Sequence, residues 1–248
     1  MAPLQLEAAE ILRRSEQGVC RPFFIRDTQG DIYVVKGVGG AGKAALTSEL
    51  ICAELGLRLG LPIPPYGIMT IPQGLISFTA IDGADELDGG PAFASKLVVN
   101  ATTLIYPQVS QIPPELKQRV LVFDRWVRNG DRRLTEKGGN VNLLWEPSSK
   151  LVVIDHNVAF DLPSNDAECI ENHVFSEEKT KFDDLLIKSE HLHALDKALG
   201  DWDTIIDLLP EEWVYKDMWD DESLVQPTLD ERFELLNRIH NGDFWRMV

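Results

Sequence analysis

Polar residues in the stretch 124–161 have the types and spacing of a site that holds a divalent cation against phosphate. Asp131 lies in a polar turn, and a β-hairpin predicted to follow it ends on Asp155. Magnesium takes a few oxygen ligands from a protein and leaves its other positions to substrate phosphates. We therefore expect Asp155 to hold metal together with Asn140, with Asn142 as the alternative.

The elements that must position these side chains are short. Apolar runs at 141–145 and 151–154 predict two strands, and the turn 147–150 would join them. An aspartate, an asparagine, a hairpin and a second aspartate follow one another in the same order in protein kinases. In that interpretation Asp131 is the base that orients the acceptor hydroxyl. The alternative is that these are ordinary polar residues, which turns and strand ends favour in any case.

The N-terminal part offers a lysine and a glutamate that could meet. Strands predicted at 23–25 and 31–36 are joined by a hairpin turn, and Lys36 ends the second strand. Residues 44–60 have the apolar spacing of a helix, on which Glu49 is flanked by small residues. Small residues let a helix approach a sheet closely, so we expect Glu49 to reach Lys36. A lysine so placed contacts the α- and β-phosphates of ATP in protein kinases.

Further elements complete an α+β chain. Residues 4–16 have helix-like spacing, and the runs 66–71 and 74–81 indicate antiparallel strands. Helices are predicted at 115–126, 181–199, 202–209 and 229–241. The predicted fold has two lobes, as in protein kinases. Residues 1–82 are predicted to form a small nucleotide-binding lobe, made of an antiparallel sheet and one helix. Residues 83–248 are predicted to form a larger, mainly helical lobe. The larger lobe holds the catalytic hairpin in 124–161 and an acidic helical layer in 162–248.

Composition restricts the functional classes. The chain has 248 residues, a net charge of −16 and 44% hydrophobic residues, as in a soluble globular protein. Residues 161–248 hold 23 of the 40 acidic residues and 8 of the 24 basic ones. Such a surface repels nucleic acid phosphates, so direct nucleic acid binding is not expected. Neither a membrane span nor a signal peptide is indicated, and three scattered cysteines form no metal or disulfide pattern. We expect a cytoplasmic protein.

A glycine-rich run offers a competing phosphate site. Gly37–Lys43 fits the pattern G-x-x-x-x-G-K of a P-loop. The next residue is Ala44, where a P-loop needs a serine or threonine hydroxyl for magnesium. The preceding hairpin signals also differ from the alternating strands and helices of a parallel sheet. A P-loop nucleotide-binding protein, or a plain solvated loop, remains an alternative.

At this point the chain resembles the HipA-like kinases, bacterial relatives of the toxin kinase of certain toxin–antitoxin systems. The resembling stretches are RPFFIRDTQGDIYVVK, SELICAELGLRLGLPIPPYGI, FDRWVRNGDRR, NVNLLW, LVVIDHNVAF, EEWV and LDERFELLNRI. Together they cover most of the chain, and their order is more specific than any one of them. The resemblance implies a two-lobed kinase that transfers the γ-phosphate of ATP to a serine or threonine hydroxyl.

The resemblance also implies roles for particular residues. Lys36 would contact ATP phosphates, Glu49 would hold Lys36, and Asp131 would be the catalytic base. Asn140 and Asp155 would hold Mg²⁺. The connection between the lobes, at Thr79, Ala80 and Ile81, would present its backbone to adenine.

Two departures from the family pattern stand out. Asp131 and Asn140 lie nine residues apart rather than five, through an insertion within RRLTEKGG, which keeps Asn142 open as the ligand. The chain is also shorter than the full toxin kinases, so their toxin activity and substrate do not carry over.

The sequence therefore predicts an ATP- and Mg²⁺-dependent serine/threonine kinase acting on an unidentified protein substrate. A partner protein encoded alongside and a link to toxin–antitoxin systems belong to the same expectation. The alternatives are a catalytically inactive kinase-fold binding module and the P-loop protein.

Overall fold

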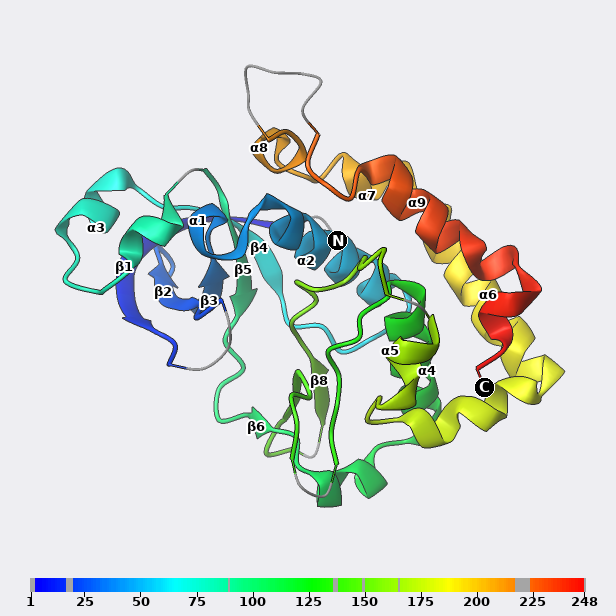
Figure 1. The fold of residues 1–248 in the computed structure, drawn as a ribbon. Helices are drawn as coiled ribbons and strands as arrows, with labels where there is room; N and C mark the ends of the chain where they lie inside the picture. Colours follow the sequence, from blue (N-terminus) through cyan, green and yellow to red (C-terminus); the bar gives the residue numbers. More distant parts are fainter. Residues whose placement is uncertain are drawn as a thin grey trace. The chain divides into compact units, whose positions relative to one another are not determined.

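The computed structural model describes residues 3–16, 20–88, 90–135, 138–148, 150–164, 166–216 and 224–247. The chain is a mixed α+β protein (Figure 1). It forms two compact units, each built from segments far apart in sequence. Unit 1 comprises Met1–Leu50, Pro64–Val98 and Leu208–Gln226, and unit 2 comprises Ile51–Ile63, Val99–Asp207 and Pro227–Val248.

The sequence predicted a small antiparallel sheet in this part of the chain, whereas unit 1 is organised around a closed five-stranded barrel that includes one parallel pair. Its strands are β1 (Leu4–Arg14), β2 (Phe23–Asp27), β3 (Ile32–Lys36), β4 (Tyr66–Thr70) and β5 (Ala92–Lys96). They pair in the order β1-β2-β3-β5-β4, and a parallel pairing of β4 with β1 closes the barrel. The remaining pairs are antiparallel.

Two predicted elements of unit 1 are wrong in type. Residues 4–14 form strand β1, not a helix. Irregularities in the pairing of β1 with β2, between Ala8 and Glu10 and between Ile11 and Arg13, break the strand's two-residue period. Ala8 and Ile11 are therefore both buried although they are three residues apart, which imitates helical spacing.

The second error concerns 74–81, where the structure has helix α3 (Gln73–Phe78) followed by irregular chain. Leu75 and Ile76 of α3 pack against the barrel core. A short apolar run fits a strand and a helix equally well, so its period gave no way to decide.

The rest of unit 1 packs around the barrel. It contains α1 (Val38–Ala41), the first part of α2 (Lys43–Arg58), the 3₁₀ helix η1 (Ala84–Leu87) and α8 (Glu211–Val214). Trp213 of α8 is fully buried, and its indole Nε1 donates to the carbonyl of Pro91 at 2.9 Å. The segment 208–226 thus returns to unit 1 after the chain has built most of unit 2.

Unit 2 combines a small sheet with helices. Strands β6 (Thr102–Thr103), β7 (Leu143–Trp145) and β8 (Leu151–Val153) form an antiparallel sheet, and β7 and β8 are the predicted hairpin in shortened form. Ser149 of the predicted turn lies outside the described residues. The helices are η2 (Tyr106–Gln111), α4 (Pro114–Trp126), α5 (Asp166–Glu171), η3 (Ser176–Asp183), α6 (Leu185–Leu199), α7 (Trp202–Ile206), α9 (Leu229–Asn237), η4 (Arg238–His240) and η5 (Gly242–Trp245).

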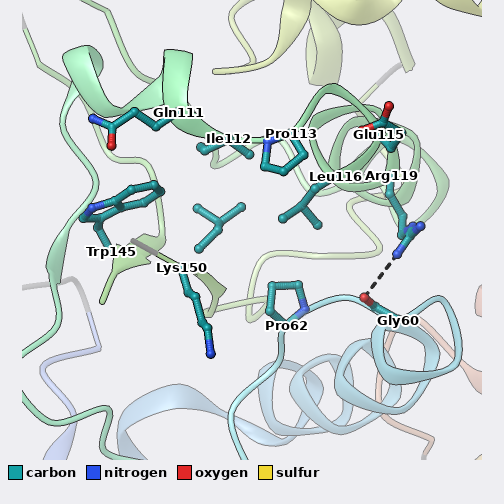
Figure 2. Close-up of a pocket in the computed structure, with 11 residues that line it drawn as sticks. Gly60, Pro62, Gln111, Ile112, Pro113, Glu115, Leu116, Arg119, Trp145 and Lys150 are labelled. Atoms are coloured by element: carbon teal, nitrogen blue, oxygen red, sulfur yellow. Dashed lines mark hydrogen bonds between the residues drawn. The ribbon is translucent and has the colours of Figure 1, made fainter. Parts of the chain in front are cut away.

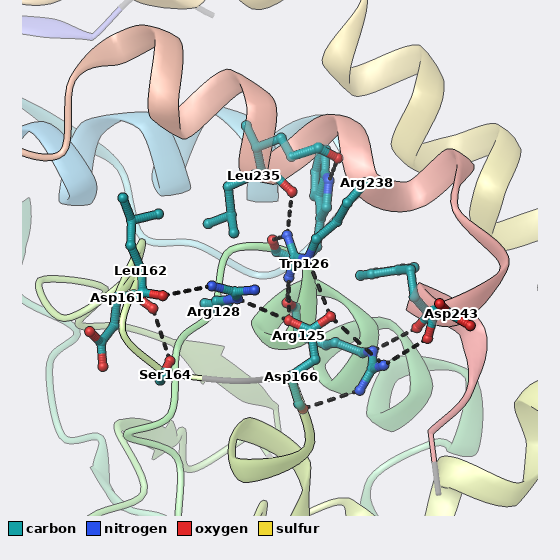
Figure 3. A network of polar contacts seen from close by, with 12 residues as sticks. Arg125, Trp126, Arg128, Asp161, Leu162, Ser164, Asp166, Leu235, Arg238 and Asp243 are labelled. Atoms are coloured by element: carbon teal, nitrogen blue, oxygen red, sulfur yellow. Dashed lines mark hydrogen bonds and ion pairs between the residues drawn. The ribbon is translucent and has the colours of Figure 1, made fainter.

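A polar network ties the end of the chain to α4 (Figure 3). Asp166 at the start of α5 pairs with Arg128 and Arg238 at 3.0 Å, and Arg125 lies 3.8 Å away. Burial acts to raise the pKa of Asp166, but hydrogen bonds and charge from Arg238 and Arg128 outweigh it and lower the pKa. Arg125 also donates to the carbonyl of Phe244 at 2.7 Å. The network thereby fixes the end of α4, from which the turn to Asp131 departs.

No helix in the described part of the chain is both long and apolar enough to cross a membrane.

Candidate functional site

Lys36 and Glu49 form a buried ion pair in unit 1. Lys36 is the last residue of β3, and its Nζ lies 2.5 Å from Oε1 of Glu49 on α2. Their exposed fractions are 8% and 3%. The expected contact is therefore present, and it places a cation at the end of a barrel strand in a poorly hydrated setting.

The glycine-rich run has a packing role in the structure. A Cβ at Gly37 would lie 2.5 Å from the carbonyl oxygen of Glu86, and one at Gly39 would lie 2.9 Å from its Cα. Glycine is thus needed at positions 37 and 39, because η1 packs directly against the backbone there. Lys43 does not point out of a loop, because its Nζ donates to the carbonyls of Tyr215 at 2.7 Å and Lys216 at 3.1 Å.

Asp131 in unit 2 is held by two asparagine side chains. Nδ2 of Asn140 donates to its Oδ2 at 2.6 Å. Nδ2 of Asn142 donates both to the backbone carbonyl of Asp131 at 3.0 Å and to Oδ2 at 3.1 Å. The structure therefore brings Asp131 together with both candidate asparagines, which lie nine and eleven positions further along the sequence.

Arg132, the neighbour of Asp131, has a role that the sequence did not reveal. It is fully buried, and its Nε pairs with Oδ2 of Asp124 on α4 at 2.6 Å. Its Nη1 donates to the carbonyls of Asn142 at 2.5 Å and Ile154 at 3.2 Å. One guanidinium thus connects α4 with both strand segments that carry the candidate metal ligands. Its place in the sequence, directly after Asp131 in a polar stretch, gives no signal of the buried carboxylate that it meets.

His173 completes the Arg132–Asp124 cluster. Its Nε2 lies 3.0 Å from Oδ2 of Asp124, and its Nδ1 accepts from the backbone N–H of Phe175 at 3.0 Å. An accepting Nδ1 is unprotonated, so the ring is neutral and donates through Nε2. Burial lowers the pKa of His173 and outweighs the opposing pull of Asp124. Burial acts to raise the pKa of Asp124, but the charge of Arg132 and the hydrogen bond from His173 hold it well below its usual value.

Asp155 follows β8 in an unusual backbone conformation. Its φ is +60°, and Asn142 across the hairpin has φ +47°. Aspartate and asparagine tolerate this left-handed region better than other non-glycine residues. The backbone N–H of Ile154 donates to the carbonyl of Asn142 at 3.2 Å, so Asn142 lies across the hairpin from the residue that precedes Asp155.

A cavity of about 360 Å³ opens beside Asp131 within unit 2. Gly130, Arg133, Val158 and Asp161 line it with Asp131, and Ser164 and Cys169 complete the wall. An aspartate at the edge of such a cavity can accept a proton from a group that enters it.

Thr79, Ala80 and Ile81 lie within unit 1. Oγ1 of Thr79 accepts from the N–H of Ile81 at 3.2 Å, and Ile81 packs against the barrel core. The chain then forms η1 and β5 and leaves unit 1 only after Val98. The contact of 79–81 with adenine stays a prediction.

The donor set in unit 2 fits a cation that arrives with a phosphate ligand. Among the described residues, no three His, Cys, Asp or Glu side chains gather as a metal site. One carboxylate, Asp155, and an asparagine amide oxygen are the candidate donors. Because both asparagines face Asp131 with their nitrogens, their oxygens remain for a cation. Mg²⁺ commonly takes one or two carboxylates and completes its sphere with water and phosphate oxygens.

A lysine–glutamate pair at the end of a strand, and an aspartate–asparagine cluster before a hairpin that ends on aspartate, are also found in protein kinases. The family model described as HipA-like kinase matches residues 8–248. The chain belongs to the HipA-like kinase family, and the resemblance read from its sequence is confirmed.

Among solved structures, the chain is similar to the crystal structure of the Helicobacter pylori proinflammatory kinase CtkA. The TM-score is 0.54 at 11% sequence identity, and the match covers 98% of this chain and 97% of that chain. At this identity the likeness concerns the fold. No curated protein matches the chain by sequence.

Proposed function

We propose that the chain is an ATP- and Mg²⁺-dependent kinase that transfers the γ-phosphate of ATP to a serine or threonine hydroxyl of a protein. The observation that carries the proposal is the Asp131 cluster. Two asparagine amides hold the carboxylate of Asp131 beside a cavity, and Arg132 binds the backbone carbonyl of one of these asparagines, Asn142. In this proposal the protein has the two lobes of a kinase, with a nucleotide-binding N-lobe and a catalytic C-lobe.

The role of Asp131 follows from its surroundings. Its Oδ2 accepts from both asparagines, which leaves Oδ1 to accept the hydrogen bond of an acceptor hydroxyl in the cavity. A carboxylate held in this way orients the hydroxyl and takes its proton as the phosphate is transferred. The neighbouring Arg133, which lines the same cavity, adds a positive charge close to the substrate.

Nucleotide binding falls to other residues in this proposal. Lys36, oriented by Glu49, binds the phosphates of ATP, and the backbone of 79–81 contacts adenine. Asp155 and one asparagine hold Mg²⁺, which when bound neutralises phosphate charge. Of the two asparagines, Asn142 has the stronger support, because Arg132 holds its carbonyl together with that of Ile154, the residue before Asp155.

The competing functions have less support. A P-loop would need a free lysine, whereas Lys43 donates to two backbone carbonyls. The glycines of the same run, Gly37 and Gly39, pack on η1. A catalytically inactive binding module would not need a carboxylate fixed beside a cavity. We further propose a cytoplasmic enzyme with a protein substrate and a partner protein encoded alongside, as in toxin–antitoxin systems. Direct binding of nucleic acid is not part of the proposal, since the chain carries a net charge of −16.

Two substitutions test the proposal because they should affect ATP binding and phosphate transfer differently. Asp155→Asn should weaken Mg²⁺-dependent ATP binding and phosphate transfer together. Asp131→Asn should leave ATP affinity within a few-fold and reduce transfer by about 10²-fold or more, the usual scale for a positioned acid or base. Calorimetry with ATP and Mg²⁺ measures the binding. Transfer of labelled phosphate to protein from a native cell lysate measures the activity.

Folding is the necessary control, and circular dichroism of both variants should match the wild type. Wild-type protein that is folded but binds no ATP at about millimolar concentration would refute the proposal. Full transfer by Asp131→Asn would refute the catalytic role of Asp131 in particular.

A further inference from the structure

Unit 2 carries a second cavity, apart from the Asp131 cluster, with apolar walls (Figure 2). Its volume is about 450 Å³, within the range of sites that bind small ligands or anchoring side chains. Its apolar walls are formed by Ile112, Pro113 and Leu116 at the start of α4 and by Trp145 and Leu151 of the hairpin. Figure 2 shows the side chains of Ile112, Pro113, Leu116 and Trp145 around a common space.

The rim of this cavity is positively charged although the chain as a whole is acidic. Arg119 and Lys150 contribute two cations, and Glu115 contributes one carboxylate. Nη1 of Arg119 donates to the carbonyl of Gly60 at 3.3 Å, while Lys150 lies on the other side of the space and is exposed (Figure 2). The cavity therefore suits apolar side chains that are accompanied by negative charge.

The surface of unit 2 presents such a group at the first turn of α6. Leu185 and Leu186 are exposed to 77% and 76%, whereas the buried residues of α6 lie in its second half. Asp183 and Asp184 precede them directly, and both are exposed. Adjacent exposed leucines mark an interaction surface more often than a solvated one.

The segment that leads into the leucines contacts α4, which also lines the cavity. Gln118 of α4 donates to Oε2 of Glu178 on η3 at 3.0 Å, and η3 leads directly into α6. Arg119, from the rim of the cavity, lies close enough to His191 of α6 to lower the pKa of its imidazole, although burial contributes more. A protein that carries both a projection and a complementary cavity can meet a second copy of itself across a two-fold axis.

We propose that this face of unit 2 is a homodimer interface, in which Leu185 and Leu186 of each protomer enter the cavity of the other. Asp183 of one protomer then meets the Lys150 side of the cavity in its partner. The arrangement closes on itself, because each protomer gives one projection and receives one. The proposal is independent of the kinase activity, since none of these residues belongs to the Asp131 cluster.

Sedimentation velocity over protein concentrations from about 1 to about 200 micromolar tests the proposal. We expect wild-type protein to pass from monomer to dimer in this range. The double change Leu185→Ser and Leu186→Ser should leave it monomeric, with an unchanged circular dichroism spectrum because both side chains are exposed. Phe78→Ser is the matched control, since Phe78 is 91% exposed in unit 1 and should have no effect.

Exchanging the two charges tests whether Asp183 of one protomer lies beside Lys150 of the other. Lys150→Glu and Asp183→Lys should each weaken dimerisation by about 10-fold, and the two together should restore most of it. A wild-type protein that is monomeric at every concentration would overturn the proposal. So would a dimer that survives the loss of both leucines, and species larger than a dimer would overturn the two-fold arrangement.

Discussion

At the scale of single residues, Arg132 fixes the geometry of the candidate site. Its guanidinium contacts the carboxylate of Asp124 and two backbone carbonyls of the hairpin, all from a fully buried position. A buried carboxylate that loses its cation keeps the cost of desolvation without compensation, which is typically about 3–5 kcal/mol. Arg132 thus links the stability of unit 2 to the placement of Asp131 and Asn142.

The adjacent arginine provides a matched comparison. Arg132→Ala should lower the free energy of unfolding by about 3 kcal/mol or more. Arg133→Ala should change it by less than about 0.5 kcal/mol, because the Arg133 side chain is exposed and donates to one carbonyl, that of Gly130. Urea unfolding followed by tryptophan fluorescence measures both. Equal losses for the two variants would show that the Asp124 pair does not support unit 2.

At the scale of elements, closure of the barrel depends on one glycine. Gly67 of β4 pairs with Leu4 of β1, and a Cβ at Gly67 would lie 2.3 Å from the carbonyl oxygen of Leu4. Backbone cannot move aside as a flexible side chain can. The parallel pairing that closes the barrel therefore requires a residue without a side chain at this position.

Gly67→Ala should accordingly destabilise the protein by about 2 kcal/mol or more, since an added methyl group must displace β1. Gly74→Ala in α3 is the control. No atom lies within 4 Å of a Cβ there, and alanine favours a helix over glycine by about 1 kcal/mol. Thermal unfolding compares the two. An unchanged melting temperature for Gly67→Ala would mean that β1 and β4 are not closely paired.

Local signals explain which elements the sequence could predict. The hairpin β2–β3, helix α2 and strands β7 and β8 follow from turn residues and apolar periods within a few positions of one another. Glu49 reached Lys36 as expected, because a strand end and one face of the next helix fix both positions. The bulged strand β1 and the short helix α3 could not be predicted. Their apolar spacing matches more than one structure, and contacts with the rest of unit 1 decide between them.

At the scale of the whole molecule, distant segments meet in ways that no local pattern contains. The barrel closes through residues 4–7 and 67–70, and the stretch 208–226 returns to unit 1 late in the chain. The pairing of Asp124 with His173 likewise joins positions 49 residues apart. The family resemblance pointed to residues that do lie together, Lys36 with Glu49 and Asp131 with Asn140, because motifs are read one residue at a time; their catalytic roles stay predictions.

One buried histidine, His173, and one half-buried histidine, His191, make the stability of the whole molecule depend on pH. Burial lowers the pKa of His173, and burial followed by the charge of Arg119 lowers that of His191 to about 4. An unfolded histidine titrates near 6.5, so below that pH the unfolded chain binds protons that the folded chain does not. Stability should therefore be constant at higher pH and be lost as the pH falls from about 6.5 toward about 4.

Each histidine can contribute a slope of at most about 1.4 kcal/mol per pH unit. Urea unfolding at pH values from about 8 to about 5 measures the combined slope. His191→Gln should reduce it while leaving the contribution of His173. A stability that is flat down to pH 5 would contradict the buried, neutral state of both side chains.

The left-handed backbone at Asn142 and Asp155 has a consequence for the history of this family. Glycine adopts that conformation without the penalty of about 1 kcal/mol that a side chain brings. Under the proposed function, a lineage that still transfers phosphate keeps asparagine and aspartate at these two positions and accepts the strained backbone. A lineage that no longer transfers phosphate can accept glycine there, because glycine removes the backbone strain. In an alignment, glycine at either position would then distinguish catalytically inactive relatives from active ones before any of them is purified.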